Sequence, residues 1–103
     1  MVVAGRDILK EFMRAFPDTK DSVEALLLEM KKAVWSTPNE LKSQYRAASI
    51  IGDGCVVFNI CGRKYRIVVK VDFESKIIKI RWAGRHKEYD KLKIKETKCL
   101  SLN

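Results

Sequence analysis

The sequence holds one histidine, and the residues around it are suited to moving protons and holding anions. His86 stands between Arg85 and Lys87 and is followed directly by Glu88-Tyr89-Asp90. Neighbouring positive charge lowers the pKa of a histidine, which can then act as a base near neutral pH. The spacing alone is equally compatible with an ordinary surface histidine, and the nearby carboxylates are also suited to salt bridges.

Two arginines in strand-like runs complete an inventory that can cleave RNA. The nucleophile is the 2′-hydroxyl of the substrate, so a protein has to remove its proton, stabilise the charge at phosphorus and protonate the 5′-oxygen. Arg66 and Arg81 suit the charge stabilisation, and His86 or a lysine with a lowered pKa suits the proton transfers. The sequence has no Gly-rich phosphate loop, no carboxylate pair spaced for two metal ions and no Ser/His/Asp set. Catalysis would therefore depend on Arg, Lys, Tyr and His.

Two aromatic residues near this segment have different expected roles. Tyr89 lies among charged residues and is available to stack on an unpaired base. Trp82 follows Ile78 and Ile80 at alternate positions, which predicts that it belongs to the apolar core.

The three cysteines are given no chemical role. Cys55, Cys61 and Cys99 include no CxxC pair, and only one histidine is available to join them. We therefore expect neither a metal site nor a cofactor.

Positive charge is concentrated in the second part of the chain. Residues 1–40 hold six Lys or Arg against seven Asp or Glu, whereas residues 41–103 hold fifteen against six, for a net charge of +8. This asymmetry places a surface for an anionic partner in the second part, although a solvated charged face is the alternative. No apolar run approaches the roughly 18 residues of a membrane span, and no secretory signal is recognisable. We expect a cytoplasmic protein.

Apolar periodicity predicts three helices in the first half of the chain. The first runs from Arg6 to Phe16 and is ended by Pro17. The second runs from Thr19 to about Val34. The third runs from a capping Thr37 to about Tyr45, with a proline at its first position and a glutamate three residues after the cap. The apolar face of the second helix comprises Val23, Leu26, Leu27, Met30 and Val34.

Beyond Ala47, β-branched and aromatic runs separated by turn residues predict antiparallel strands at 49–51, 55–60, 65–72 and 76–83. Gly84 then leads into a polar loop. The fold class is α+β: one domain of residues 1–103, with helices at about 6–45 packed on one face of an antiparallel sheet at about 48–83, and a cationic C-terminal segment at 84–103.

Alternation in the last two strands predicts which side chains share a face. One face should carry Tyr65, Ile67, Val69, Val71, Ile78, Ile80 and Trp82. The other should carry Lys64, Arg66, Lys70, Asp72, Lys79 and Arg81. The first set suits a helix-covered core. On the second, Arg66, Lys79 and Arg81 would be neighbours, and an anionic ligand would relieve their mutual repulsion.

Two motifs within residues 57–91 resemble the HigB toxins of the RelE-like superfamily. They are Val57-Phe58-Asn59-Ile60-Cys61-Gly62-Arg63-Lys64-Tyr65-Arg66-Ile67-Val68 and Ile80-Arg81-Trp82-Ala83-Gly84-Arg85-His86-Lys87-Glu88-Tyr89-Asp90-Lys91. The combination of FNI-x-G-x-x-x-R-x-V, I-R-x-x-G and H-x-E-Y-D is specific, and a weaker likeness extends through the helices.

The resemblance implies the toxin of a type II toxin–antitoxin pair, with a RelE-like fold. It would cut translated mRNA in the ribosomal A site without a metal ion, and it would form a hetero-oligomer with a helix-turn-helix, HigA-like antitoxin. The implied catalytic residues are Arg66, Arg81, His86 and Tyr89. The motif match also carries over Asn59, which fits turn or strand structure equally well. The predicted RNA-binding residues are Asn59 and the cationic Lys64, Lys79, Arg85 and Lys87.

Two alternatives and one departure accompany this interpretation. The basic surface also suits a non-enzymatic RNA- or ribosome-binding module, and the superfamily includes inhibitors of DNA gyrase. Cys61 stands where many relatives have the first of two glycines, which puts the geometry of that turn in doubt.

Overall fold

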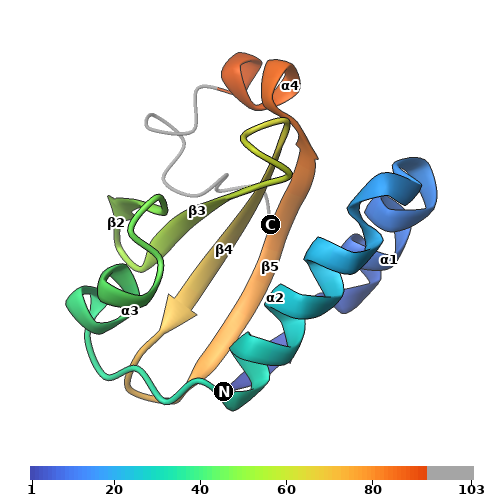
Figure 1. Ribbon diagram of the computed structural model, residues 1–103. Coiled ribbons are helices and arrows are strands. Elements are labelled where there is room, and N and C mark those ends of the chain that lie inside the picture. Colours follow the sequence, from blue (N-terminus) through green and yellow to red (C-terminus); the bar gives the residue numbers. More distant parts are fainter. Residues whose placement is uncertain (93–103) are drawn as a thin grey trace.

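The computed structural model describes residues 1–92, which form helices and one β-sheet (Figure 1). The helical elements are α1 (Arg6–Ala15), η1 (Pro17–Thr19), α2 (Lys20–Lys32), α3 (Pro38–Gln44) and α4 (His86–Lys91). The strands are β1 (Val2–Ala4), β2 (Ser49–Gly52), β3 (Cys55–Ile60), β4 (Tyr65–Asp72) and β5 (Ile77–Arg85). The predicted α+β class is confirmed, while β1 and α4 were not predicted. Cys99 and the rest of the expected segment 84–103 beyond Leu92 lie outside the described residues.

The strands are ordered β1-β5-β4-β3-β2 in one sheet. Strands β2 to β5 pair antiparallel as predicted, whereas β1 runs parallel to β5 with Val3 opposite Ile78. The sheet is therefore mixed rather than purely antiparallel. A three-residue strand is too short for alternation to reveal, which explains why it escaped prediction.

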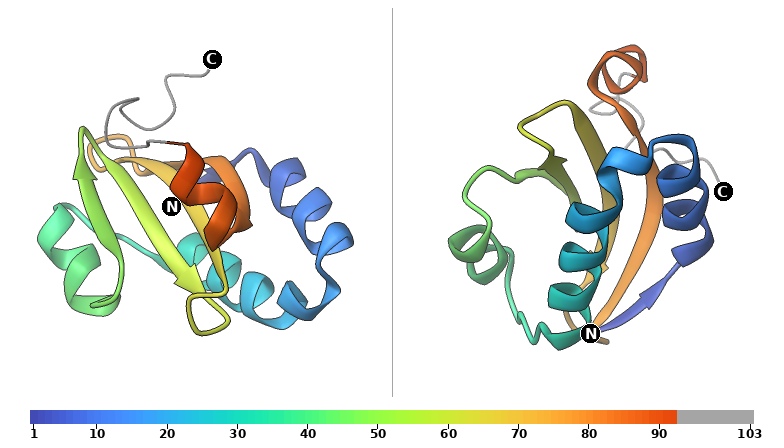
Figure 2. Two further views of the ribbon diagram at one scale, coloured as in Figure 1. Left: turned by 90° about the horizontal axis from the view of Figure 1, so that it is seen from above. Right: turned by 45° about the vertical axis from the view of Figure 1, so that its right-hand side comes forward.

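Helices α1 and α2 cover one face of the sheet, and α3 lies beside β2 (Figures 1 and 2). The core between them contains Leu9 and Phe12 of α1, Val23, Leu26 and Met30 of α2, and Phe58, Ile67, Val69, Ile78 and Ile80 of the strands. Val34 was expected in this core but is 77% exposed, because α2 ends at Lys32 and Ala33 is already extended. None of the helices in residues 1–92 is long and apolar enough to cross a bilayer.

Helix α3 begins as its sequence predicts. The hydroxyl of Thr37 accepts a hydrogen bond from the backbone N–H of Glu40 at 3.3 Å, and Pro38 occupies the first helical position. Such a cap stabilises a helix by about 1 kcal/mol.

Three rows of side chains cross the helix-free face of the sheet. The first row contains Asn59, Arg66 and Gly84; the second row contains Val57, Val68 and Trp82; the third row contains Cys55, Lys70 and Lys79. Polar and cationic residues thus flank an apolar strip. Adjacent rows are two residues apart along β3 and β4, which is about 6.6 Å.

A β-bulge in β5 decides how these rows are composed. Trp82 pairs with Val68 and Ile80 pairs with Val69, so Arg81 is an extra residue on β5. A bulge interrupts the alternation of side chains. Trp82 therefore packs with Val57 on the helix-free face, and the prediction that it belongs to the helix-covered core was wrong.

The bulge also changes which cations are neighbours. Lys79 lies opposite Lys70, while Arg66 lies opposite Gly84 at the other end of the face. The predicted grouping of Arg66 with Lys79 and Arg81 was therefore wrong.

The turn between β3 and β4 has an unusual backbone. Cys61, Gly62 and Arg63 have positive φ angles of 52°, 61° and 76°. A cysteine in this conformation costs roughly 1–2 kcal/mol relative to ordinary backbone, and the expected effect of Cys61 on the geometry of the turn stays a prediction. The carbonyl of Lys64, which follows it, accepts a hydrogen bond at 3.1 Å from the N–H of His86 and so connects the turn to the start of α4.

Candidate active site

Helix α4 presents three side chains above the first row. His86 and Asp90 are four residues apart and Tyr89 is three residues from His86, so they share one side of this short helix. The polar loop predicted after Gly84 is thus a strand end followed by a helix. Its hexapeptide has no buried residue, and it therefore lacks the apolar periodicity from which a helix is predicted.

The start of α4 is held by Glu88. Its Oε1 atom accepts hydrogen bonds from the backbone N–H and from Nε of Arg85, both at 3.3 Å. These bonds lower the pKa of Glu88 below its ordinary value. A carboxylate at this position is also favoured by the partial positive charge of a helix N-terminus.

His86 lies between a guanidinium and a carboxylate. Its Nε2 atom is 2.8 Å from Nη2 of Arg66, and its Nδ1 atom is 3.0 Å from Oδ2 of Asp90. An arginine can only donate, so Nε2 accepts and the ring proton of the neutral histidine is on Nδ1, directed to Asp90. The lone pair of Nε2 is therefore beside a fixed cation.

Tyr89 supports the arginine. The guanidinium carbon of Arg66 is 4.5 Å from the ring centroid of Tyr89, and the ring centroid of Trp82 is 6.2 Å from that of Tyr89. Burial raises the pKa of the Tyr89 hydroxyl, against an opposing influence from Arg66. Tyr89 is therefore a neutral phenol near pH 7. Its ring contacts Arg66 in this structure, and the predicted role of Tyr89 in base stacking or positioning stays a prediction.

Two polar atoms of the first row have no hydrogen-bond partner among the described residues. They are Nε of Arg66 and Oδ1 of Asn59, and both are buried. The amide nitrogen of Asn59 donates to the carbonyl of Ala47 at 3.2 Å, which fixes the orientation of the side chain. A buried donor and a buried acceptor without partners are typical of a site that a ligand completes.

Three of the predicted RNA-binding cations surround His86. Lys64, Arg85 and Lys87 line a hollow with it, whose volume is about 480 Å³. Arg85 is also paired with Glu88, and Nζ of Lys64 lies 3.3 Å from Oδ2 of Asp18. Both pairs are largely exposed, so they contribute little to stability and can exchange for a phosphate.

The remaining predicted residues, Lys79 and Arg81, are not part of this group. They line a separate hollow of about 290 Å³ with Lys70, Asp72 and Ile77. No hydrogen bond or ion pair within residues 1–92 connects Arg81 to Arg66 or to His86. Asp90 was predicted to form a salt bridge and was assigned no other role. Its spacing of four residues from His86 is the signal in the sequence that places the two side chains together on a helix.

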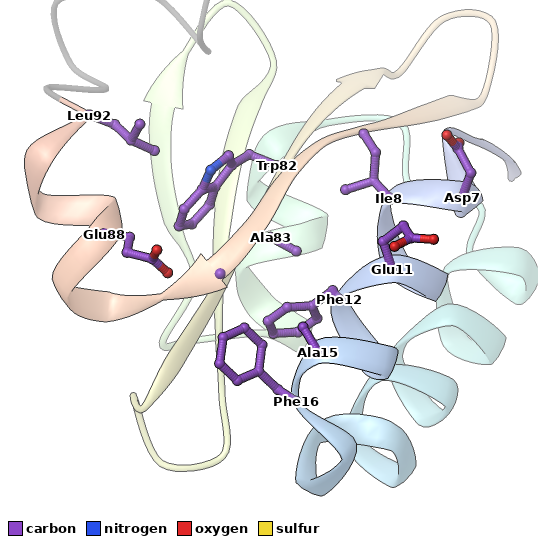
Figure 3. A pocket seen from close by; sticks show the side chains of 11 residues that line it. Asp7, Ile8, Glu11, Phe12, Ala15, Phe16, Trp82, Ala83, Glu88 and Leu92 are labelled. Atoms are coloured by element: carbon purple, nitrogen blue, oxygen red, sulfur yellow. The ribbon is translucent and has the colours of Figure 1, made fainter.

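Trp82 separates the active-site side of α4 from a groove beside α1 (Figure 3). Its indole lies over Gly84, where a Cβ atom would be 2.7 Å from the ring. The groove has a volume of about 680 Å³ and is lined by residues that include Phe12 of α1, Phe16 directly after α1, Trp82, Glu88 and Leu92. The indole thus lies between Tyr89, on the side of the cationic site, and a groove lined largely by apolar residues.

Residues 1–92 include no group of three or more His, Cys, Asp or Glu side chains placed to hold a metal ion. The site consists of Arg66, His86, Tyr89 and Asp90, with Asn59 and three lysine or arginine side chains around them.

Comparison with known proteins agrees with these motifs. Residues 19–92 match the model of the HigB toxin family, described as the RelE-like toxic component of a toxin–antitoxin system. The chain is 33% identical over 84 residues to the mRNA interferase toxin HigB of Escherichia coli K12, covering 80% of this chain and 81% of the relative. The mRNA interferases HigB of Escherichia coli O157:H7 and of Shigella flexneri match with the same identity and coverage. On this basis the chain belongs to the HigB toxin family of RelE-like toxins.

Proposed function

We propose that this HigB-family toxin is an mRNA interferase that cleaves RNA by attack of the 2′-hydroxyl, with His86 and Arg66 at the reacting phosphate. The observation that carries the proposal is the 2.8 Å contact between Nη2 of Arg66 and Nε2 of His86. It places a proton acceptor and a fixed positive charge within reach of one phosphodiester. The names of the bacterial relatives supply the class of substrate.

The reaction can be written with these groups. When the phosphate binds, Nη2 of Arg66 turns from Nε2 of His86 to a non-bridging oxygen, which frees the lone pair of Nε2. Nε2 then takes the proton of the 2′-hydroxyl, and the resulting imidazolium is stabilised by the carboxylate of Asp90. The 2′-oxygen forms a bond to phosphorus while the bond from phosphorus to the 5′-oxygen breaks. Arg66 turns its free donors to the non-bridging oxygens, whose charge increases in the transition state. The departing 5′-oxygen takes a proton from a water molecule at the partly exposed His86, and this water takes the proton held on Nε2 in return, so His86 becomes neutral again. The products carry a 2′,3′-cyclic phosphate and a 5′-hydroxyl.

The surrounding residues would hold the RNA. Asn59 offers a buried acceptor without a partner among the described residues, suited to a base or a ribose hydroxyl. Lys64, Arg85 and Lys87 supply positive charge around the scissile phosphate. Tyr89 keeps Arg66 in place by stacking on it.

We propose further that the substrate is mRNA in the ribosomal A site. The hollow at His86 is lined by this residue and by Lys64, Arg85 and Lys87, which attract a phosphate from any direction. An external surface that fixes the RNA in line for attack would supply the orientation that these cations do not. The protein would then act in the cytoplasm. Membership of a toxin–antitoxin family implies a cognate antitoxin, for which we propose a HigA-like helix-turn-helix protein in a hetero-oligomer.

The test is cleavage of mRNA on programmed ribosomes by the purified protein. Wild type should produce fragments with cyclic phosphate ends. His86→Ala and Arg66→Ala should lower the maximal rate by about 10²–10³-fold, because a proton acceptor or a charge stabiliser is lost. Lys10→Gln, an exposed position on α1, is the control and should keep the wild-type rate.

Three results would contradict the proposal. Intact mRNA with unchanged ribosome binding would indicate a non-enzymatic module. Arrest of growth by DNA damage, relieved by gyrase mutations, would indicate a gyrase inhibitor. Cleavage by His86→Ala at the wild-type rate would remove His86 from the mechanism.

A further inference from the structure

The third row of the helix-free face is a cationic cluster for which the proposed cleavage reaction has no use. Lys70 of β4 and Lys79 of β5 lie directly opposite each other, and Arg81 lines the same hollow. Like charges at directly opposed positions of a sheet destabilise it. Among residues 1–92, none of the three cations has an ion pair that would offset this repulsion.

The one acidic residue beside the cluster is already engaged. Oδ1 of Asp72 accepts hydrogen bonds from the backbone N–H groups of Glu74 at 3.1 Å and Ser75 at 3.0 Å. It therefore holds the turn between β4 and β5. Nε of Arg81 is buried and has no hydrogen-bond partner among the described residues. The Asp72 carboxylate still interacts electrostatically with Lys79. One carboxylate therefore faces three cations, and the cluster keeps a net positive charge that an anionic ligand would offset.

The bulge in β5 shapes the cluster. With Arg81 as the extra residue, Lys79, Arg81 and Trp82 are all directed to the helix-free side, where regular alternation would have left Trp82 on the other face. A cation and an indole ring are thus brought next to each other on one surface. Proteins that bind single-stranded nucleic acids use cations to hold the phosphates and aromatic rings to stack on the bases.

The position of the cluster relative to the active site fixes which part of an RNA it can reach. Lys70 is four residues along β4 from Arg66, which corresponds to about 13 Å at roughly 3.3 Å per residue. Neighbouring phosphates of a single strand are closer together than this. Between the two cationic rows lies the second row, with Val57, Val68 and Trp82. Val57 and Val68 are almost completely buried, so the partly exposed Trp82 is the side chain that lies between the two cationic rows at the surface.

We propose that Lys70, Lys79 and Arg81 form a second phosphate-binding subsite, which holds an RNA phosphate on the same strand as the one that is cut but not adjacent to it. The subsite rests on the proposed function, since it extends the same RNA along the sheet from β4 residue Arg66. Of the second row, only Trp82 is partly exposed, so its indole is the group that an intervening base would contact. The subsite increases the affinity for RNA and determines which phosphate lies at the active site. Arg66 and His86 still carry out the cleavage.

The experiment combines a protein variant with a chemical change in the RNA. Lys70→Gln with Lys79→Gln removes two charges and leaves Arg81, which forms the bulge, in place. The control is Lys10→Gln with Lys31→Gln, which removes the same charge from exposed positions on α1 and α2. Programmed ribosomes carry mRNAs with one neutral methylphosphonate linkage, moved phosphate by phosphate to either side of the cut. Circular dichroism and thermal unfolding establish that both double variants are folded.

The expected result is position-specific. Lys70→Gln with Lys79→Gln should raise the half-saturating concentration of programmed ribosomes about tenfold. It should also reduce the slope of log K against log salt concentration by roughly 0.7 per lost phosphate contact. One methylphosphonate position that is not adjacent to the scissile phosphate should weaken the binding of wild type. It should weaken the binding of the control variant by a similar factor. It should have no additional effect on the Lys70/Lys79 variant.

Failure of the subsite and failure of the proposed function are distinguishable. If wild type cuts mRNA but the methylphosphonate and the double substitution act additively at every linkage, the subsite does not exist and the nuclease remains. An effect of the Lys70/Lys79 variant equal to that of the control would have the same meaning. If wild type cuts no mRNA, the proposed function is wrong and the subsite, which rests on it, is wrong as well.

Discussion

Arg66 is the residue on which the site depends, because it makes two contacts with α4 at once. Its guanidinium lies on the ring of Tyr89 while Nη2 contacts His86. A planar, always charged group can make both contacts and still have donors directed elsewhere, which a lysine cannot do. In the proposed mechanism, Tyr89 is therefore a positioning residue, and His86 and Arg66 are the groups at the reacting atoms.

Asp90 acts through His86 in the same way. Replacing it by asparagine should lower kcat by about 10²-fold or more and leave KM nearly unchanged, because the amide neither stabilises the imidazolium nor selects the Nδ1–H tautomer. Measurement of kcat and KM on mRNA-programmed ribosomes tests this. Asp90→Glu should recover part of the rate, since it restores the charge.

The exposed Glu24 of α2 offers a matched control for the loss of one carboxylate. Glu24→Gln should keep the wild-type kcat. An equal fall in kcat for both substitutions, or a change confined to KM in Asp90→Asn, would show that Asp90 does not act through the histidine.

The sequence predicted much of the site at the level of residues. The motifs selected His86, Arg66 and Tyr89, and the structure brings all three together although 20 residues separate Arg66 from His86. The same reasoning placed Arg81 with them, and it overlooked the pairing of Lys70 with Lys79. Both errors have one cause. The register of β4 against β5, including the bulge at Arg81, depends on how the two strands pair, and neither strand specifies it alone.

At the scale of elements, alternation was reliable wherever the strands pair regularly. It predicted the helix-covered residues of β4 and the first half of β5, and it failed from Arg81 onward because of the bulge. The short helix α4 was missed for a related reason. Its residues are polar and are ordered by contacts with β4 and β5 rather than by a pattern of their own.

The turn before β3 shows how closely two elements approach. Gly54 has a φ of +79°, and a Cβ atom there would be 2.4 Å from the carbonyl oxygen of Val71. Gly54→Ala should therefore lower the free energy of unfolding by about 2–4 kcal/mol, because the backbone of β4 has to move. Urea denaturation measures the change.

Gly62 is the comparison for this effect. Its φ is +61°, and nothing lies within 4 Å of a Cβ atom at that position. Gly62→Ala should cost only about 1–2 kcal/mol, from the left-handed backbone alone. Equal costs for the two substitutions would contradict the proposed clash at Val71.

At the scale of the whole molecule, the helical layer and the sheet are joined by ionisable groups near the active site. Asp18, in η1, accepts hydrogen bonds from the hydroxyl of Tyr65 at 3.0 Å and from Nζ of Lys64 at 3.3 Å. Burial acts to raise the pKa of Asp18, but these bonds outweigh it and the net pKa lies below the ordinary value of 3.8. The carboxylate form is thus favoured by folding.

The sign of the resulting pH dependence follows. A carboxylate with a lowered pKa stabilises the folded state fully above its ordinary value, and this stability is lost as the pH falls through the lower, folded-state value. Asp18→Asn should therefore make the free energy of unfolding fall less steeply below about pH 4 than it does in wild type. Urea denaturation at a series of pH values tests this.

Tyr65→Phe, which removes one of the bonds to Asp18, should have the same effect in part. Asp72 and Glu88 also have lowered pKa values, so some acid sensitivity remains in both variants. Acid-side slopes identical to that of wild type would show that Asp18 does not join the two layers in this way.

The shortness of α4 has a consequence for how the toxin can be silenced. A helix of six residues has little stability of its own, and this one buries no residue completely. It stays folded through a few contacts, chiefly those of Tyr89, of Glu88 and of the His86 backbone with the β3–β4 turn. Its free energy of local opening is therefore well below that of the whole domain. Because His86 and Asp90 lose their arrangement when it opens, a small bias in that local equilibrium is enough to switch off cleavage while the rest of the protein stays folded.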